Sequence, residues 1–191
     1  MMPDLTGMMG LRLATSSDPT LAAGIEFHHA TDAAFHGASQ FLAMCASGVA
    51  ELTEQGVGRG AARAVAHVGT ELLLDGRMSH DRASRAAYGD SLQYALTHEL
   101  AETLALPDAR DRARLHAGLA RLHTAPVPEG YREPAFVLDR LENILARRPR
   151  LALQPADRPH VELFLTRARA HVNDTWLELL DQVRAALPAA S

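Results

Sequence analysis

Two short stretches of the sequence carry metal-ligand residue types at the spacing of helical turns. The residues of the first stretch are His28, Asp32 and His36, and those of the second are His67, Glu71 and Asp75. Successive residues of an α-helix are about 100° apart, so three residues at a spacing of four span roughly 80° of one face. Imidazole and carboxylate groups bind divalent metals. The spacing therefore predicts that two helices bring these side chains to one metal site.

The second stretch lies in an apolar segment. Between Arg63 and Asp75 the sequence reads AVAHVGTELLL, in which His67 and Glu71 are the only ionisable residues. A helix that is apolar nearly all round is usually buried, and a buried carboxylate needs a partner because an unpaired charge is costly to desolvate. Two interpretations stay open: a metal bound between the helices, or His–carboxylate hydrogen bonds that only join them. The presence of two such sets in a short span favours the metal.

The expected metal ligands are His28, Asp32, His67 and Glu71. If they bind one ion, their ligand atoms should point into one cavity and lie within about 4–5 Å of one another, given metal–ligand bonds of roughly 2.0–2.3 Å. A mixed set of nitrogen and oxygen ligands suits Mn²⁺, Mg²⁺ or Fe, and Zn²⁺ is also compatible. Such a metal lowers the pKa of a bound water and polarises a phosphoryl oxygen.

Further residues could complete a reaction at this metal. His36, or Asp4 if the N-terminal segment folds back, could take or give a proton. Arg59 and Arg63 flank the predicted third helix and could neutralise a phosphate. The alternative for both arginines is an ordinary solvated surface position.

Composition limits the class of protein. The chain of 191 residues suits one domain, residues 1–191 with an irregular segment at 1–18. Its apolar runs are far shorter than the ~20 residues of a membrane span, and its N-terminus lacks the basic and apolar regions of a signal peptide. We expect a cytoplasmic protein, in agreement with the single cysteine, Cys45. The net charge of −4 argues against a nucleic-acid-binding protein, and the absence of lysine excludes lysine-based catalysis.

The hydrophobic pattern predicts helices throughout and no strand. Apolar residues recur at intervals of three and four, and proline and glycine separate the segments. The predicted helices are residues 19–36, 38–55, 61–74, 84–106, 109–123, 135–147 and 158–187. Asp18 before Pro19 is typical of an N-cap followed by proline at the first helical position, and Gly76 is expected to end the third helix. The predicted fold is all-α, an irregular bundle of six or seven helices.

The segment LAAGIEFHHATD resembles the Gly-Ile-x-x-His-x-x-x-Asp segment of the acyl carrier protein phosphodiesterase family. Members of this family are all-helical, HD-like, metal-dependent hydrolases. His28 and Asp32 fall on the His and Asp of that motif. AHVGTELLLDG takes the place of a family segment with Asp, three residues and then Asp-His. His67 and Glu71 therefore stand at the two Asp positions and keep ligand chemistry, whereas Leu72 stands where the family has His.

Two shorter similarities accompany this motif. ILARRPRL at residues 144–151 resembles an Arg-Pro-Arg segment of the family, and PDLTGM at residues 3–8 matches its early Asp through Asp4. The resemblance implies hydrolysis of the phosphodiester that joins 4′-phosphopantetheine to a serine of acyl carrier protein. The expected partner is therefore acyl carrier protein or a small phosphodiester. Acyl carrier proteins are acidic and would need a basic surface, for which the candidates are Arg147, Arg148 and Arg150.

Two other functions fit part of the pattern. Glu26 and His29 form one Glu-x-x-His pair, as in carboxylate-bridged di-iron bundles, but that fold needs a second pair and two further Glu. A non-enzymatic helical interaction protein, in which the His and acidic residues are structural, would need no metal. The sequence leaves the oligomeric state open.

Overall fold

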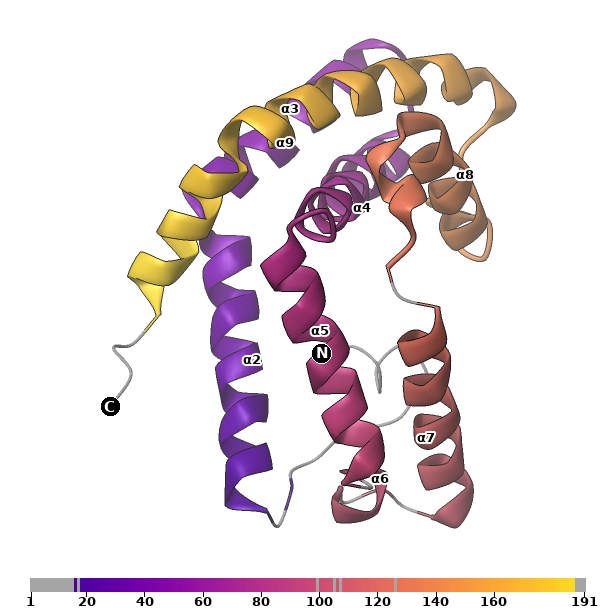
Figure 1. Ribbon diagram of the computed structural model, residues 1–191. Coiled ribbons are helices and arrows are strands. Elements are labelled where there is room, and N and C mark those ends of the chain that lie inside the picture. The colour runs from indigo at the N-terminus through magenta and orange to yellow at the C-terminus, as the bar shows by residue number, and fades with distance from the viewer. Residues whose placement is uncertain are drawn as a thin grey trace. The chain divides into compact units, whose positions relative to one another are not determined.

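The computed structural model describes Ser16 and residues 18–98, 100–104, 106, 108–125 and 127–187. Within these residues the regular elements are all helical: seven α-helices of twelve or more residues, the four-residue α6, and two 3-10 helices (Figure 1). Backbone pairing of the β type is limited, in this part of the chain, to one isolated bridge between Ser16 and Leu104. The all-α prediction is confirmed. None of the described helices is both long enough and apolar enough to cross a membrane.

The chain divides into two compact units, and each unit combines two separate stretches of sequence. The first unit is Met1–Ala33 with Arg82–Pro126, and the second is Ala34–Asp81 with Val127–Ser191. The single domain of residues 1–191 expected from the sequence remains a prediction.

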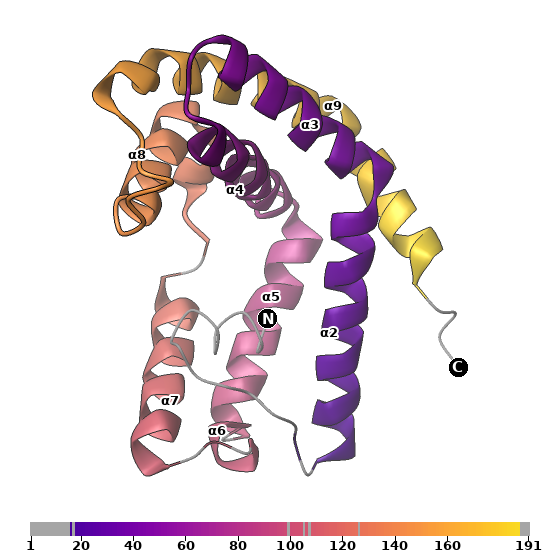
Figure 2. The same cartoon turned by 180° about the vertical axis from the view of Figure 1, so that it is seen from behind.

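The first unit is built from helices that surround a small leucine-rich core. Its helices are α2, Pro19–Gly37, as far as Ala33, then α5, Arg82–Thr97, α6, Leu100–Thr103, and α7, Ala109–Thr124. Helices α5 and α7 pack side by side, as Figures 1 and 2 both show, and bury Leu92, Leu115 and Leu119 between them. Asp18 accepts hydrogen bonds from the backbone N–H groups of Thr20 and Leu21 at 2.8 and 3.0 Å, which confirms the predicted N-cap.

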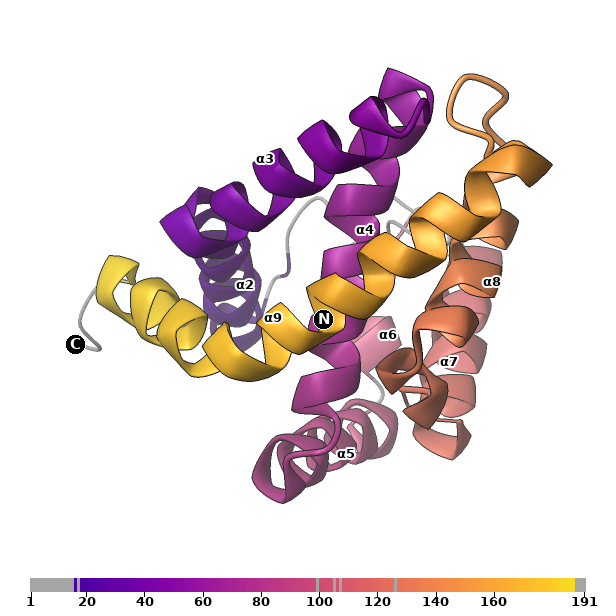
Figure 3. The same cartoon turned by 90° about the horizontal axis from the view of Figure 1, so that it is seen from above.

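The second unit is organised around α4. Its elements are α3, Ser39–Glu54, α4, Arg59–Met78, the 3-10 helix η1, Glu129–Arg132, α8, Pro134–Leu145, the 3-10 helix η2, Pro155–Asp157, and α9, Arg158–Ala186. Helix α4 packs against α3, α8, α9 and η1, and Figure 3 shows α9 crossing it. Glycines allow close approach at these contacts. A Cβ at Gly69 would lie 2.9 Å from the side chain of Leu165, and a Cβ at Gly48 of α3 would lie 2.6 Å from the ring of Phe164.

These neighbours leave one stripe of α4 partly exposed. The stripe has a spacing of four residues and contains Arg63, His67, Glu71 and Asp75. The expectation that this helix, with Glu71, is buried was therefore wrong for the face that carries Glu71, whose side chain is 32% exposed. Ala64, Val68 and Leu72 lie beside the stripe and are only partly buried, because no neighbouring helix of the second unit covers this face completely.

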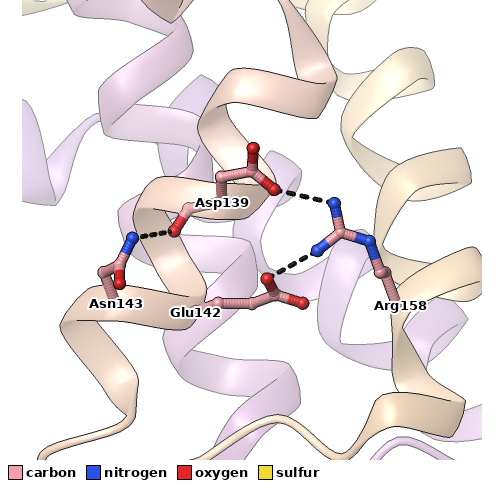
Figure 4. A network of polar contacts seen from close by, with 4 residues as sticks. All are labelled: Asp139, Glu142, Asn143 and Arg158. Atoms are coloured by element: carbon pink, nitrogen blue, oxygen red, sulfur yellow. Dashed lines mark hydrogen bonds and ion pairs between the residues drawn. The ribbon is translucent and has the colours of Figure 1, made fainter.

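An ion-pair network fixes the start of α9 against α8. The guanidinium of Arg158 donates to Asp139 at 2.7 Å and to Glu142 at 2.5 Å, and the side chain of Asn143 donates to the backbone carbonyl of Asp139 at 2.8 Å (Figure 4). The hydrogen bonds to Asp139 and then Glu142 raise the pKa of this guanidinium above its ordinary value. The network thus joins the first residue of the 29-residue α9 to α8.

Two predicted boundaries were wrong. The helix predicted at residues 84–106 is two helices, because α5 ends at Thr97 and α6 begins at Leu100. At this break the hydroxyl of Thr97 donates to the carbonyls of Gln93 and Tyr94 in the last turn of α5. Gly76 does not end the third helix. It lies within α4, where its missing side chain allows the backbone of η1 to approach.

Replacing Gly76 by Ala should destabilise the protein. The new Cβ would lie 2.5 Å from the carbonyl carbon and oxygen of Tyr131, which are backbone atoms that cannot rotate away. We expect a loss of about 1–3 kcal/mol in the free energy of unfolding, measured by chemical denaturation. The matched control is Gly89→Ala in α5, where a Cβ meets nothing within 4 Å; that change should stabilise by about 0.5–1 kcal/mol. Equal effects of the two substitutions would contradict the assigned contact.

Candidate metal centre

Three potential metal ligands come together in the second unit. They are His36 in the last turn of α2 and the pair His67 and Glu71 on the exposed stripe of α4. The Nε2 atom of His67 lies 3.2 Å from Oε1 of Glu71, and Nε2 of His36 lies 3.7 Å from the same oxygen. One ligand atom from each residue lies within 4.8 Å of the others, and among the residues that the structure describes this is the one group of its kind.

A short connection places His36 beside α4. Helix α2 ends at Gly37 and α3 begins at Ser39, so a single residue, Ala38, lies between the two helices. Helix α3 packs along α4, and His36, at the end of α2, is therefore held close to the middle of α4. The two imidazole rings are stacked, with centroids 5.0 Å apart and an angle of 10° between their planes.

Phe41 orients both imidazoles. Its ring is 1% exposed and meets the rings of His36 and His67 edge-on, with centroid distances of 5.3 and 5.2 Å. Phe35 packs against it at 4.4 Å. Aromatic contacts of this type have defined geometry. Both imidazoles therefore pack against the phenyl ring with their Nε2 atoms directed toward Glu71.

The distances in this group can be compared with those between ligands of one ion. Two atoms bound tetrahedrally to one metal at roughly 2.0–2.1 Å lie about 3.3 Å apart. The 3.2 Å between His67 and Glu71 is compatible with that spacing and also with a weak hydrogen bond, whereas the 3.7 Å between His36 and Glu71 is too long for a hydrogen bond. The three residues therefore form a possible metal-binding triad, in which the ligand atoms would move closer together around an ion.

The site is partly open to solvent. The side chains of His36, His67 and Glu71 are 34%, 46% and 32% exposed. Structural zinc sites are closed by four protein ligands, whereas catalytic sites have three protein ligands and an open position. Water can reach the three side chains at this level of exposure, so an ion held by them would have open coordination positions.

The structure brings together two of the four predicted ligands. His67 and Glu71 belong to the group, whereas His28 and Asp32, which lie two turns and one turn before His36 on α2, do not. His28 instead lines a cavity of about 600 Å³ in the first unit. His36 was predicted as a proton-transfer residue, and the structure places it among the potential ligands.

Arg59 and Arg63, the other described residues of the predicted site, are not members of this group. Arg63 is exposed on the same stripe of α4, one turn before His67, and Arg59 is the first residue of that helix. Asp4 lies outside the described residues. Sequence reasoning gave no role to Phe41, because an apolar residue at helical spacing looks like any other core residue.

The pKa of the Cys45 thiol depends in part on the negative charge of Glu71. Cys45 lies one turn after Phe41 on α3, with Sγ 3.9 Å from the carbonyl oxygen of Ala66. Burial raises the pKa of its thiol to about 11, and the negative charge of Glu71 adds to this effect. At neutral pH the thiol is therefore protonated and a poor nucleophile.

No family model, curated protein or solved structure matches this chain. The resemblance to the acyl carrier protein phosphodiesterases therefore depends on the sequence motifs alone, and the shared property that the structure shows is the all-helical fold.

The reactivity of Cys45 should report the charge on Glu71. In metal-free protein we expect iodoacetamide to alkylate Cys45 slowly at pH 8, with a rate that rises toward pH 11. Glu71→Gln removes a negative charge that disfavours the thiolate, so it should lower the thiol pKa and speed alkylation at a fixed pH. Glu54→Gln, which removes an exposed charge from α3, is the control and should leave the rate unchanged. Identical rates in the wild type and Glu71→Gln would contradict this electrostatic coupling.

Proposed function

We propose that this protein is a divalent-metal-dependent hydrolase that acts on phosphodiesters. One observation carries the proposal: two imidazole nitrogens from different helices converge on the same carboxylate oxygen at a partly exposed position. Two His and one Glu are a ligand set of catalytic metal sites, in which the remaining coordination positions take water and substrate.

The donor set narrows the choice of metal. Two imidazole nitrogens and one carboxylate oxygen suit Fe²⁺, Mn²⁺ or Zn²⁺ better than Mg²⁺ or Ca²⁺, which prefer oxygen ligands. Of the metals expected from the sequence, Mg²⁺ is therefore the least favoured. With neutral imidazoles and one carboxylate, a divalent ion would retain a net charge of +1 and attract an anionic substrate.

The residues of the chain would bind the metal and orient the substrate. When bound, the metal supplies an activated water and polarises a phosphoryl oxygen. Phe41 holds the two imidazoles in place. Arg63, one turn from His67 on the exposed stripe, is placed to pair with a phosphate oxygen. The family resemblance adds the substrate class, either the phosphopantetheine ester of acyl carrier protein or a small phosphodiester.

One specific observation favours a second candidate function. The 3.2 Å contact between His67 and Glu71 joins residues four apart on one helix, a pairing that stabilises helices without any metal. Under this alternative the protein is a non-enzymatic helical interaction protein. A di-iron centre is less compatible, because the ligand group contains one carboxylate and such centres use four.

Chelation should separate these functions. If the group binds a metal, EDTA should lower the stability of metal-loaded wild-type protein by RT ln(1 + [L]/Kd), about 2.7 kcal/mol when the metal was at 100 times Kd. For a chain of this length that is a fall of roughly 5–10 °C in Tm. Glu71→Gln should melt like the EDTA-treated wild type and ignore added metal, whereas the exposed control Glu178→Gln should behave like the wild type. A wild-type Tm that does not respond to EDTA would favour the structural alternative.

Two histidines of α2 give a direct test of the ligand set. His36→Gln removes a residue of the observed group, and His28→Gln removes a residue that only the sequence pattern predicted. We expect His36→Gln to weaken metal binding by at least about tenfold, measured by calorimetric titration with Mn²⁺ or Zn²⁺, because a three-ligand site then has two ligands. His28→Gln should bind like the wild type. The reverse result would restore the ligand set predicted from the sequence.

A further inference from the structure

A second polar cavity in the same unit has the composition of an anion site. It has a volume of about 270 Å³. Its lining residues are Leu73, Arg77, His80, Arg132, Glu133, Arg169, Ala170 and Asn173. These residues come from α4 and the turn after it, from η1 and the residue that follows it, and from α9. Segments that are far apart in the sequence therefore contribute to one cavity.

The charges that line the cavity are unbalanced. Three guanidinium groups and one carboxylate give a net charge of +2 with His80 neutral, although the whole chain carries −4. Like charges brought together repel one another, and a bound anion removes that repulsion. His80 and Asn173 add neutral hydrogen-bonding groups to the same walls.

Contacts with the surrounding protein hold two of the three arginine side chains, those of Arg77 and Arg169. The guanidinium of Arg77 lies over the ring of Trp176, 4.2 Å from its centroid. Arg169 donates through one nitrogen to the carbonyl of Arg132 at 3.4 Å and to the carboxylate of Glu133 at 3.3 Å. These distances are longer than the 2.7–2.9 Å that is typical of charge-assisted bonds, so the pairing of Arg169 with Glu133 can yield to a stronger acceptor.

The close approach at Gly76 sets the geometry of the cavity. Gly76 lies against the backbone of Tyr131, and each of these residues is followed directly by an arginine of the cavity. Arg77 and Arg132 are therefore brought to the same place by a packing contact of the core. Leu73, which is 2% exposed, forms the apolar part of the wall one turn earlier on α4.

We propose that this cavity binds the phosphoryl group of a small phosphate monoester. A phosphate dianion matches the net charge of +2, and the planar guanidinium presents paired donors that fit phosphate oxygens. The volume of about 270 Å³ is just below the roughly 300–1,000 Å³ of drug-sized ligand pockets, so it can accommodate a phosphoryl group with a few further atoms but not a nucleotide. The ligand takes the place of Glu133 as the partner of Arg169.

This anion cavity is distinct from the metal centre. Arg77 follows Glu71 by six residues on α4, which is about 240° around the helix and about 9 Å along its axis. The inference therefore does not depend on the proposed hydrolase function, and metal-free protein is suitable for testing it.

The test is calorimetric titration of the full chain in EDTA at constant ionic strength, with inorganic phosphate and glycerol 3-phosphate as probes. The wild type should bind both, with the ester at least as tight, whereas the same concentration of chloride should give no binding.

Arg169→Gln should weaken phosphate binding by at least about tenfold, because it removes a charged donor. Glu133→Gln should strengthen binding, because the carboxylate competes with phosphate for Arg169.

A second ion pair supplies matched controls. Arg167 lies on α9 two residues before Arg169, about 200° around the helix, and pairs with Glu51 at 2.9 Å. Arg167→Gln and Glu51→Gln change the net charge by the same amounts outside the cavity, so both should bind phosphate like the wild type. Absence of phosphate binding to the wild type, failure of the ester to bind, or equal effects of the Arg167 and Arg169 substitutions would each overturn the proposal.

Discussion

The coverage of α4 by its neighbours is the constraint on which the second unit depends. Nine of its residues are buried, and its glycine and alanine positions allow α3, α8, α9 and η1 to approach closely. Burying a charge against those neighbours would be costly, so ionisable groups can occupy only the uncovered stripe and the C-terminal end of the helix. His67 and Glu71 lie on the stripe, and Arg77 lies at the end. Both candidate sites are therefore located where the packing of α4 leaves room for them.

Packing also gives the two sites their rigidity. Ligands bind well when the residues that hold them are already fixed before binding. At the metal centre this function belongs to Phe41, a core residue that contacts both imidazoles. At the anion cavity it belongs to Gly76, whose contact with η1 brings together two arginines that are 55 residues apart in sequence. In both cases a packing contact of a buried residue positions polar groups that solvent can reach.

The sequence predicted the helices well, and two of its four proposed ligands, His67 and Glu71, lie in the group that the structure brings together. Helical periodicity and the signals at Asp18 and Pro19 located α2, α7 and α9 to within a residue or two. Spacing shows which residues share a helix face, but it does not show which turn of that face meets a neighbour. His28, Asp32 and His36 share one face of α2, so their spacing does not show which of them contacts α4. The one-residue link between α2 and α3 places His36 there. The anion cavity combines segments that no spacing rule connects, so only the three-dimensional structure could indicate it.

The interactions among His36, His67 and Glu71 contribute much less to the stability of the fold than the apolar contacts of α4 do. Ion pairs that are about a third exposed contribute roughly 0–1 kcal/mol, whereas each leucine buried around α4 contributes about 1.5–3 kcal/mol. The apolar contacts therefore hold α4 in place whether or not His36, His67 and Glu71 interact. A bound divalent ion could add more than the ion pairs themselves, because its binding free energy is added to that of folding. A stability effect of Glu71 that appears only in metal-loaded protein and is lost on chelation would therefore come from a bound ion, whereas its pairs with His36 and His67 would act with or without metal.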